Sequence, residues 1–94
     1  MYKYFVEFWG VVVLTYAGLL TDGNPFVMGV TYFSVYMIGQ EVEKVYFNPL
    51  FVVANAIMGR MTFGEAWTYL LTQALALLST LVTFVPTKTF IDAM

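Results

Sequence analysis

Long apolar runs separated by short polar turns dominate the chain, and they predict a succession of helices. The first run covers residues 4–20 and is interrupted only by Glu7 and Thr15, which is close to the minimum for a helix that crosses a membrane. The second covers 25–40 and the last covers 62–85. At 1.5 Å per residue, the second helix is about 24 Å long and the last about 36 Å, so the last is long enough to cross with tilt.

A shorter apolar run predicts a half-length helix over 49–58. Asn48 is a suitable N-cap, Pro49 suits the first turn because it has no N–H to donate, and Gly59 is a natural stop. Such a helix spans about 15 Å, roughly half of a hydrocarbon core. Asn55 is its only polar residue, so it has no polar face for the headgroups. We therefore favour a re-entrant half-helix over one lying on the membrane surface.

Composition places the chain among membrane proteins and excludes several other classes. It is 61% hydrophobic and 11% charged, which is too apolar for an ordinary small soluble domain. The four Lys and Arg residues form no basic patch, so we expect no nucleic-acid partner. The chain has no His and no Cys, and its carboxylates fall mostly at predicted helix ends. We therefore expect no enzyme activity, no metal site and no cofactor.

Glu7 is the one acid of the first helix, and a charged group inside a membrane segment is costly. Such an acid faces a partner or a water-filled cavity, unless it lies close enough to the interface to snorkel. Gly10, Ala17 and Thr21 fall on its face of the helix, and small residues there allow a close neighbour. This face should point into the protein. The same run could be the core of a signal peptide cleaved near Ala17, but we expect it to be retained.

The other helices carry features for which packing is the simpler interpretation. Three aromatic residues of the second helix are expected to face lipid: Tyr32, Phe33 and Tyr36. In the last helix, Thr62 and Glu65 have the spacing of a capping box, and Pro86 should end the helix. Small and polar residues form a stripe along it that suits close helix packing: Glu65, Thr68, Thr72, Ala76, Ser79 and Thr83.

The order and spacing of these features over almost the whole chain resemble the first half of the aquaporin and aquaglyceroporin family. Asn48, Pro49 and Leu50 stand where that family has its Asn-Pro-Ala signature, and Glu7 matches the acidic residue of its first helix. The start of the family's third membrane helix is matched by Thr62, Phe63, Ala66, Tyr69 and Gln73. The resemblance covers one of the two inverted repeats from which such channels are built.

This resemblance implies an all-α membrane protein in which residues 1–94 form a single membrane domain of three transmembrane helices plus one re-entrant half-helix. It implies that Glu7 accepts hydrogen bonds from backbone N–H groups of the re-entrant loop, which we favour over snorkelling. Gln73 would support the same loop, and Asn48 would line the pore.

The chain also departs from the family's pattern. Tyr46 and Leu50 are larger than the residues they replace, so we expect a narrowed or closed path. Met28 occupies the filter position, where an aromatic residue is usual.

The implied function is a half-channel that passes water or small neutral solutes when it is paired with an inverted second half. The alternative is a non-conducting structural or accessory subunit of a larger complex or virus particle. Either function has the lipid bilayer and other membrane protein chains as partners, in a homo-oligomer or in a larger complex. Lys3, Lys44 and Arg60 would face one side and Lys88 the other, which predicts a cytoplasmic N-terminus and weighs against an antiparallel pair of identical copies.

Overall fold

A computed structural model describes residues 2–41 and 45–94, and within these ranges it contains helices and loops but no strand. The helices are α1 (Tyr2–Thr21), α2 (Pro25–Gln40), α3 (Pro49–Ile57) and α4 (Phe63–Ala93). Two segments of the described chain are long and apolar enough to cross a membrane, Lys3–Thr21 and Phe63–Ala93.

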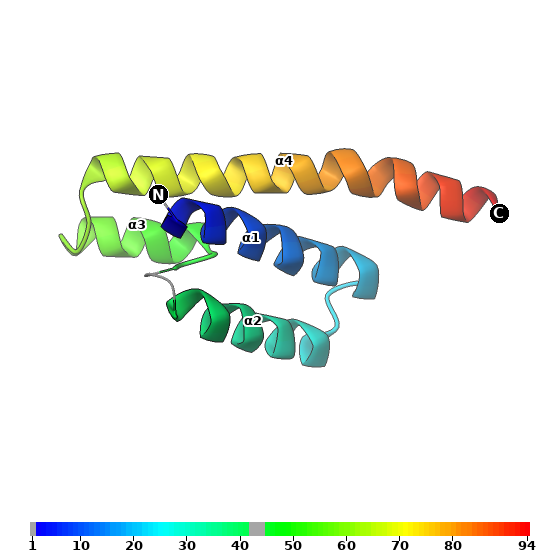
Figure 1. Cartoon of the computed structure of the whole chain (residues 1–94), viewed down its shortest axis with the longest axis horizontal. Coiled ribbons are helices and arrows are strands. Elements are labelled where there is room, and N and C mark those ends of the chain that lie inside the picture. The colour runs from blue at the N-terminus through cyan, green and yellow to red at the C-terminus, as the bar shows by residue number, and fades with distance from the viewer. Residues whose placement is uncertain (1, 42–44) are drawn as a thin grey trace.

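The helices lie side by side along the long axis of the molecule (Figure 1). α1 and α4 run in the same direction and pack against each other, and α2 runs back along α1. From residue 45 the chain turns towards the middle of the molecule, and α3 then returns along α4 to the end at which α2 finished. The amino end of α3 therefore lies near the middle of the long axis of the molecule, and its carboxyl end lies towards one end of that axis.

Polar groups are buried in this fold, and apolar groups cover it. The largest fully buried side chains are Glu7, Val52 and Thr80, and Gln73 is only 6% exposed. By contrast, many of the large apolar side chains are exposed, among them Phe26, Phe33, Leu50, Phe63, Trp67 and Val82. A soluble domain shows the opposite distribution.

Two glycines let the segment before α3 enter the seam between α1 and α2. A Cβ atom on Gly10 of α1 would lie 2.0 Å from Cε1 of Phe47, and one on Gly39 of α2 would lie 2.8 Å from Cγ2 of Val45. Val45 and Phe47 are both buried there, in one cluster with Val11 of α1. Gly10 is one of the small residues predicted to admit a close neighbour, whereas Gly39 is not singled out by the sequence pattern.

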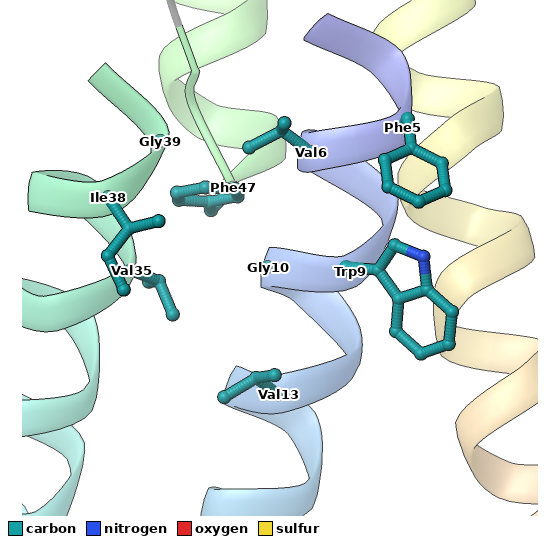
Figure 2. Close-up of a pocket in the computed structure, with 9 residues that line it drawn as sticks. All are labelled: Phe5, Val6, Trp9, Gly10, Val13, Val35, Ile38, Gly39 and Phe47. Carbon is teal, nitrogen blue, oxygen red and sulfur yellow. The ribbon is translucent and has the colours of Figure 1, made fainter. Parts of the chain in front are cut away.

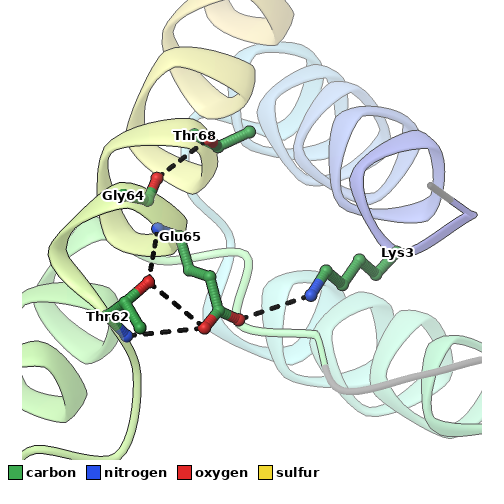
Figure 3. A network of polar contacts seen from close by, with 5 residues as sticks. All are labelled: Lys3, Thr62, Gly64, Glu65 and Thr68. Atoms are coloured by element: carbon green, nitrogen blue, oxygen red, sulfur yellow. Dashed lines mark hydrogen bonds and ion pairs between the residues drawn. The ribbon is translucent and has the colours of Figure 1, made fainter.

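The start of α4 has the predicted capping box. The Oγ1 atom of Thr62 accepts a hydrogen bond from the backbone N–H of Glu65 at 3.1 Å, and the Glu65 carboxylate accepts one from the backbone N–H of Thr62 at 3.5 Å (Figure 3). Lys3 reaches the same carboxylate at 3.4 Å, which links the first turns of α1 and α4.

The prediction that Pro86 ends the last helix is wrong, since α4 continues through Pro86 to Ala93. Proline removes one backbone hydrogen bond, which a long helix tolerates where other groups pair nearby. The turns after Pro86 carry side-chain contacts as well: the Thr87 hydroxyl donates to the carbonyl of Thr83 at 2.7 Å, and Lys88 pairs with Asp92 at 3.5 Å.

Alanine substitutions at two helix-interior glycines should have opposite effects on stability. Gly10→Ala forces the Phe47 ring to move and should lower the free energy of unfolding by about 1–3 kcal/mol, the usual range for overpacking. Gly29→Ala should be neutral or stabilising by up to about 1 kcal/mol, because no atom of the described residues, apart from its chain neighbours and its own helix backbone, lies within 4 Å of its Cβ position. Unfolding in mixed detergent micelles measures both. Equal stability of the two variants would contradict the placement of Phe47.

Candidate functional site

The carboxylate of Glu7 is the centre of the site, and it is completely buried. Its Oε2 accepts a hydrogen bond from the backbone N–H of Tyr46 at 2.9 Å, and its Oε1 accepts one from the N–H of Phe47 at 2.5 Å. The Nε2 group of Gln73 on α4 donates to the same Oε1 at 2.8 Å. Glu7 therefore joins α1, the segment before α3 and α4 at one point, and it does not snorkel.

Gln73 is the second buried polar side chain of this centre. Its amide nitrogen is used by Glu7, whereas its Oε1 atom is buried and has no hydrogen-bond partner among the described residues. The amide thus holds the carboxylate from α4, at the same oxygen that the Phe47 N–H bonds.

Tyr36 belongs to the site too, although we expected it to face lipid. Its hydroxyl donates a hydrogen bond to the backbone carbonyl of Tyr46, and its ring meets that of Phe47 edge-on, with centroids 5.1 Å apart. The signal in the sequence is its spacing, because Tyr36 lies one turn before Gly39 and on the same face of α2. Phe33, by contrast, is 68% exposed, as a lipid-facing residue would be.

Asn48 caps the amino end of α3. Its side-chain Oδ1 accepts a hydrogen bond from the N–H of Leu50 at 2.9 Å, and its backbone carbonyl accepts one from Val52 at 3.3 Å. The Nδ2 group is the donor of this side chain, and within the described chain it makes no hydrogen bond. Pro49 forms the first turn, and Leu50 is 76% exposed. The signature residues thus stand at an open face of the molecule.

The other predicted pore residues lie in different surroundings. The Tyr46 ring is half-buried and packs edge-on against Tyr69 of α4 at 5.0 Å between centroids. Met28 lies in the first half of α2, with its sulfur 3.6 Å from the Cβ position of Gly18 on α1. Glu7, Tyr46, Asn48 and Gln73 are therefore gathered around one segment, whereas Met28 is separate from them.

The charged residues used to predict orientation are divided between the two ends of the molecule. The start of α1 and the loop from α3 to α4 share one end, and the last turns of α4 form the other (Figure 1). Lys44 lies outside the described residues. Which end faces the cytoplasm stays a prediction.

An apolar groove of about 300 Å³ opens between α1 and α2, next to the segment before α3. Figure 2 shows Phe5, Trp9 and Val13 along α1, Ile38 on α2, and the Phe47 ring between the two helices. Its lining has the chemistry to hold hydrocarbon rather than a polar ligand. The described residues contain no cluster of carboxylates that could hold a metal ion.

Comparison with protein-family models, curated proteins and solved structures finds no match for this chain. The geometry of the site is therefore the basis on which a function can be inferred.

Replacing the buried carboxylate should destabilise the fold strongly. Glu7→Gln keeps the shape but replaces one accepting oxygen with an NH₂ group, so that a backbone N–H or the Gln73 amide loses its acceptor. A buried unsatisfied group costs about 1–3 kcal/mol, and more where the lost acceptor was charged. Glu41→Gln is the matched control, because Glu41 is exposed at the end of α2. Unfolding in micelles should show a loss for Glu7→Gln alone, and a loss of equal size in both variants would contradict the role given to Glu7.

Proposed function

We propose that this chain is an aquaporin-like half-channel, an integral membrane protein of the bilayer with its N-terminus on the cytoplasmic side. In this proposal α1, α2 and α4 cross the membrane and α3 is a re-entrant half-helix. The observation that carries the proposal is the buried Glu7 carboxylate, which accepts two backbone N–H groups of the irregular segment that leads into α3. Irregular backbone is tolerated at membrane depth only where its polar groups are satisfied by protein or water.

The distribution of polarity supports the membrane part of the proposal. Hydrocarbon around the molecule would stabilise its exposed apolar side chains, while the buried Glu7, Gln73 and Thr80 avoid that solvent. α2 has 16 residues, or about 24 Å. A helix of that length crosses a bilayer that thins locally around it, and its ends are marked by the polar residues Asn24 and Glu41.

The chemistry at the start of α3 supports passage of water or small neutral solutes. A helix amino end carries unpaired N–H groups and about half a positive charge, and the Nδ2 group of Asn48 adds a side-chain donor. Donors at membrane depth need an acceptor, and single-file water supplies one while the positive helix end opposes cations. The open face at Pro49 and Leu50 is where an inverted second half, supplied by another membrane protein chain or a second copy, would complete the path.

A second candidate is a non-conducting structural or accessory membrane subunit. It is favoured by the state of Tyr46, whose ring is packed on Tyr69 and whose carbonyl is occupied by the hydroxyl of Tyr36. One of the two acceptor sites of this carbonyl is therefore already occupied, which leaves it less available to water. The same fold would then serve as a packing scaffold for other membrane protein chains.

Osmotic shrinkage of proteoliposomes measures conduction. The proposal expects water permeability above that of empty vesicles, and Asn48→Ala should return it towards the empty-vesicle level by removing the side-chain donor. Asn24→Ala is a closely matched control, because Asn24 also precedes a proline and also caps a helix, with its Oδ1 accepting from Phe26 at 3.0 Å and Val27 at 3.1 Å. This control should keep the native permeability.

The experiment separates the two candidates when it is done with the pure protein and with its membrane partners present. Permeability equal to empty vesicles in both preparations would reject the half-channel and favour the accessory subunit. An equal effect of Asn48→Ala and Asn24→Ala would reject a specific role for the signature.

A further inference from the structure

The peptide unit between Tyr46 and Phe47 is held from both sides. Its carbonyl, which belongs to Tyr46, accepts the hydrogen bond from the Tyr36 hydroxyl of α2. Its N–H, which belongs to Phe47, donates to Glu7 of α1 at 2.5 Å. Because a peptide unit is planar and turns as one body, these two bonds together fix its rotation. Either bond alone would leave one end of the unit without its partner.

Phe47 has a backbone conformation that needs such restraint. Its φ angle is +58°, in the left-handed region that bulky residues rarely adopt. The ring is only 5% exposed and sits where Gly10 and Gly39 leave room. A strained residue persists only where its surroundings over-determine it, and here the surroundings are the ring site and the two hydrogen bonds. A loss of either bond should let the backbone relax.

The peptide also connects parts of the fold that otherwise do not touch. Within the described residues, α2 packs on α1 and α3 packs on α4, and no packing contact joins α2 to α3. The bond from Tyr36 is a direct polar connection from α2 to the segment that ends at Asn48, the cap of α3. Together with the packing of Gly39 against Val45 and Phe47, this bond connects the position of α2 to the start of α3.

We propose that Tyr36 is a positioning residue, whose hydroxyl orients the Tyr46–Phe47 peptide and thereby sets where Asn48 and the first turn of α3 stand. Its importance for conduction rests on the proposed half-channel, since the start of α3 is the pore-forming part of that proposal. The placement itself is a property of the fold and can be measured without any transport.

Spin labels on an otherwise cysteine-free chain measure this placement. The protein has no Cys, so Leu50→Cys at the start of α3 and Val82→Cys on α4 give a single labelled pair, and both positions are exposed. Tyr36→Phe keeps the ring and removes the hydroxyl. In vesicles, this variant should lose the single narrow distance of the parent pair and show a shifted, broader distribution.

Tyr32→Phe is the control, because Tyr32 lies one turn earlier on α2 and its ring stacks on Tyr36 at 5.6 Å, while its hydroxyl forms no hydrogen bond within the described chain. It should keep the parent distance. An unchanged distance in Tyr36→Phe, or the same broadening in both variants, would overturn the proposal.

Two further measurements keep the test decisive. If Tyr36→Phe does not fold, solid-state NMR of the native protein should show a cross-peak between the Tyr36 hydroxyl proton and the Tyr46 carbonyl carbon, and its absence would overturn the proposal. The distance measurement needs no solute flux. If the native protein does not conduct but Tyr36→Phe broadens the distance distribution, the half-channel is rejected and the positioning role of Tyr36 is retained.

Discussion

Backbone N–H groups that lie away from water need acceptors, and this requirement governs the structure around Glu7. The segment before α3 is not helical, so its amides cannot pair within it, and the buried carboxylate accepts two of them. Gln73 then meets the carboxylate from α4. Removing the carboxylate would leave donors from two elements unpaired at once, which is why a costly buried acid stabilises this fold.

Packing makes the same arrangement possible sterically. Gly10 and Gly39 create the space that Phe47 fills, and Phe47 carries the N–H that reaches Glu7. The direction of α3 follows, since Asn48 caps the helix immediately after this buried residue. A short helix with its amino end inward is thus the consequence of one carboxylate and two glycines on neighbouring helices.

The parts of this fold that depend on local rules could be predicted from the sequence. Asn48 with Pro49, and Thr62 with Glu65, mark helix starts through caps whose hydrogen bonds involve residues two to four positions apart. The Glu7 contact could be predicted only through its cost in an apolar helix and the resemblance to a known family, because its partners lie far along the chain.

Two other features could not be predicted from such rules. The hydrogen bond from the Tyr36 hydroxyl forms because the folded chain brings the Tyr46 carbonyl next to α2. The continuation of α4 past Pro86 to Ala93 departs from the rule that proline ends a helix. The spacing of Tyr36 and Gly39 on α2 was the available signal for the first, and the chain contains no comparable signal for the second.

In the proposed topology, α3 starts deep in the membrane and ends near its surface. Single spin labels at Leu50 and Ile57, the first introduced by Leu50→Cys and the second by Ile57→Cys, report depth through their accessibility to oxygen and to a polar relaxation agent in vesicles. We predict that the Leu50 label is the deeper one by about 10 Å, the length of seven helical residues along a membrane-normal helix. Equal shallow depths for the two labels would show that α3 lies flat at the surface and would contradict the account.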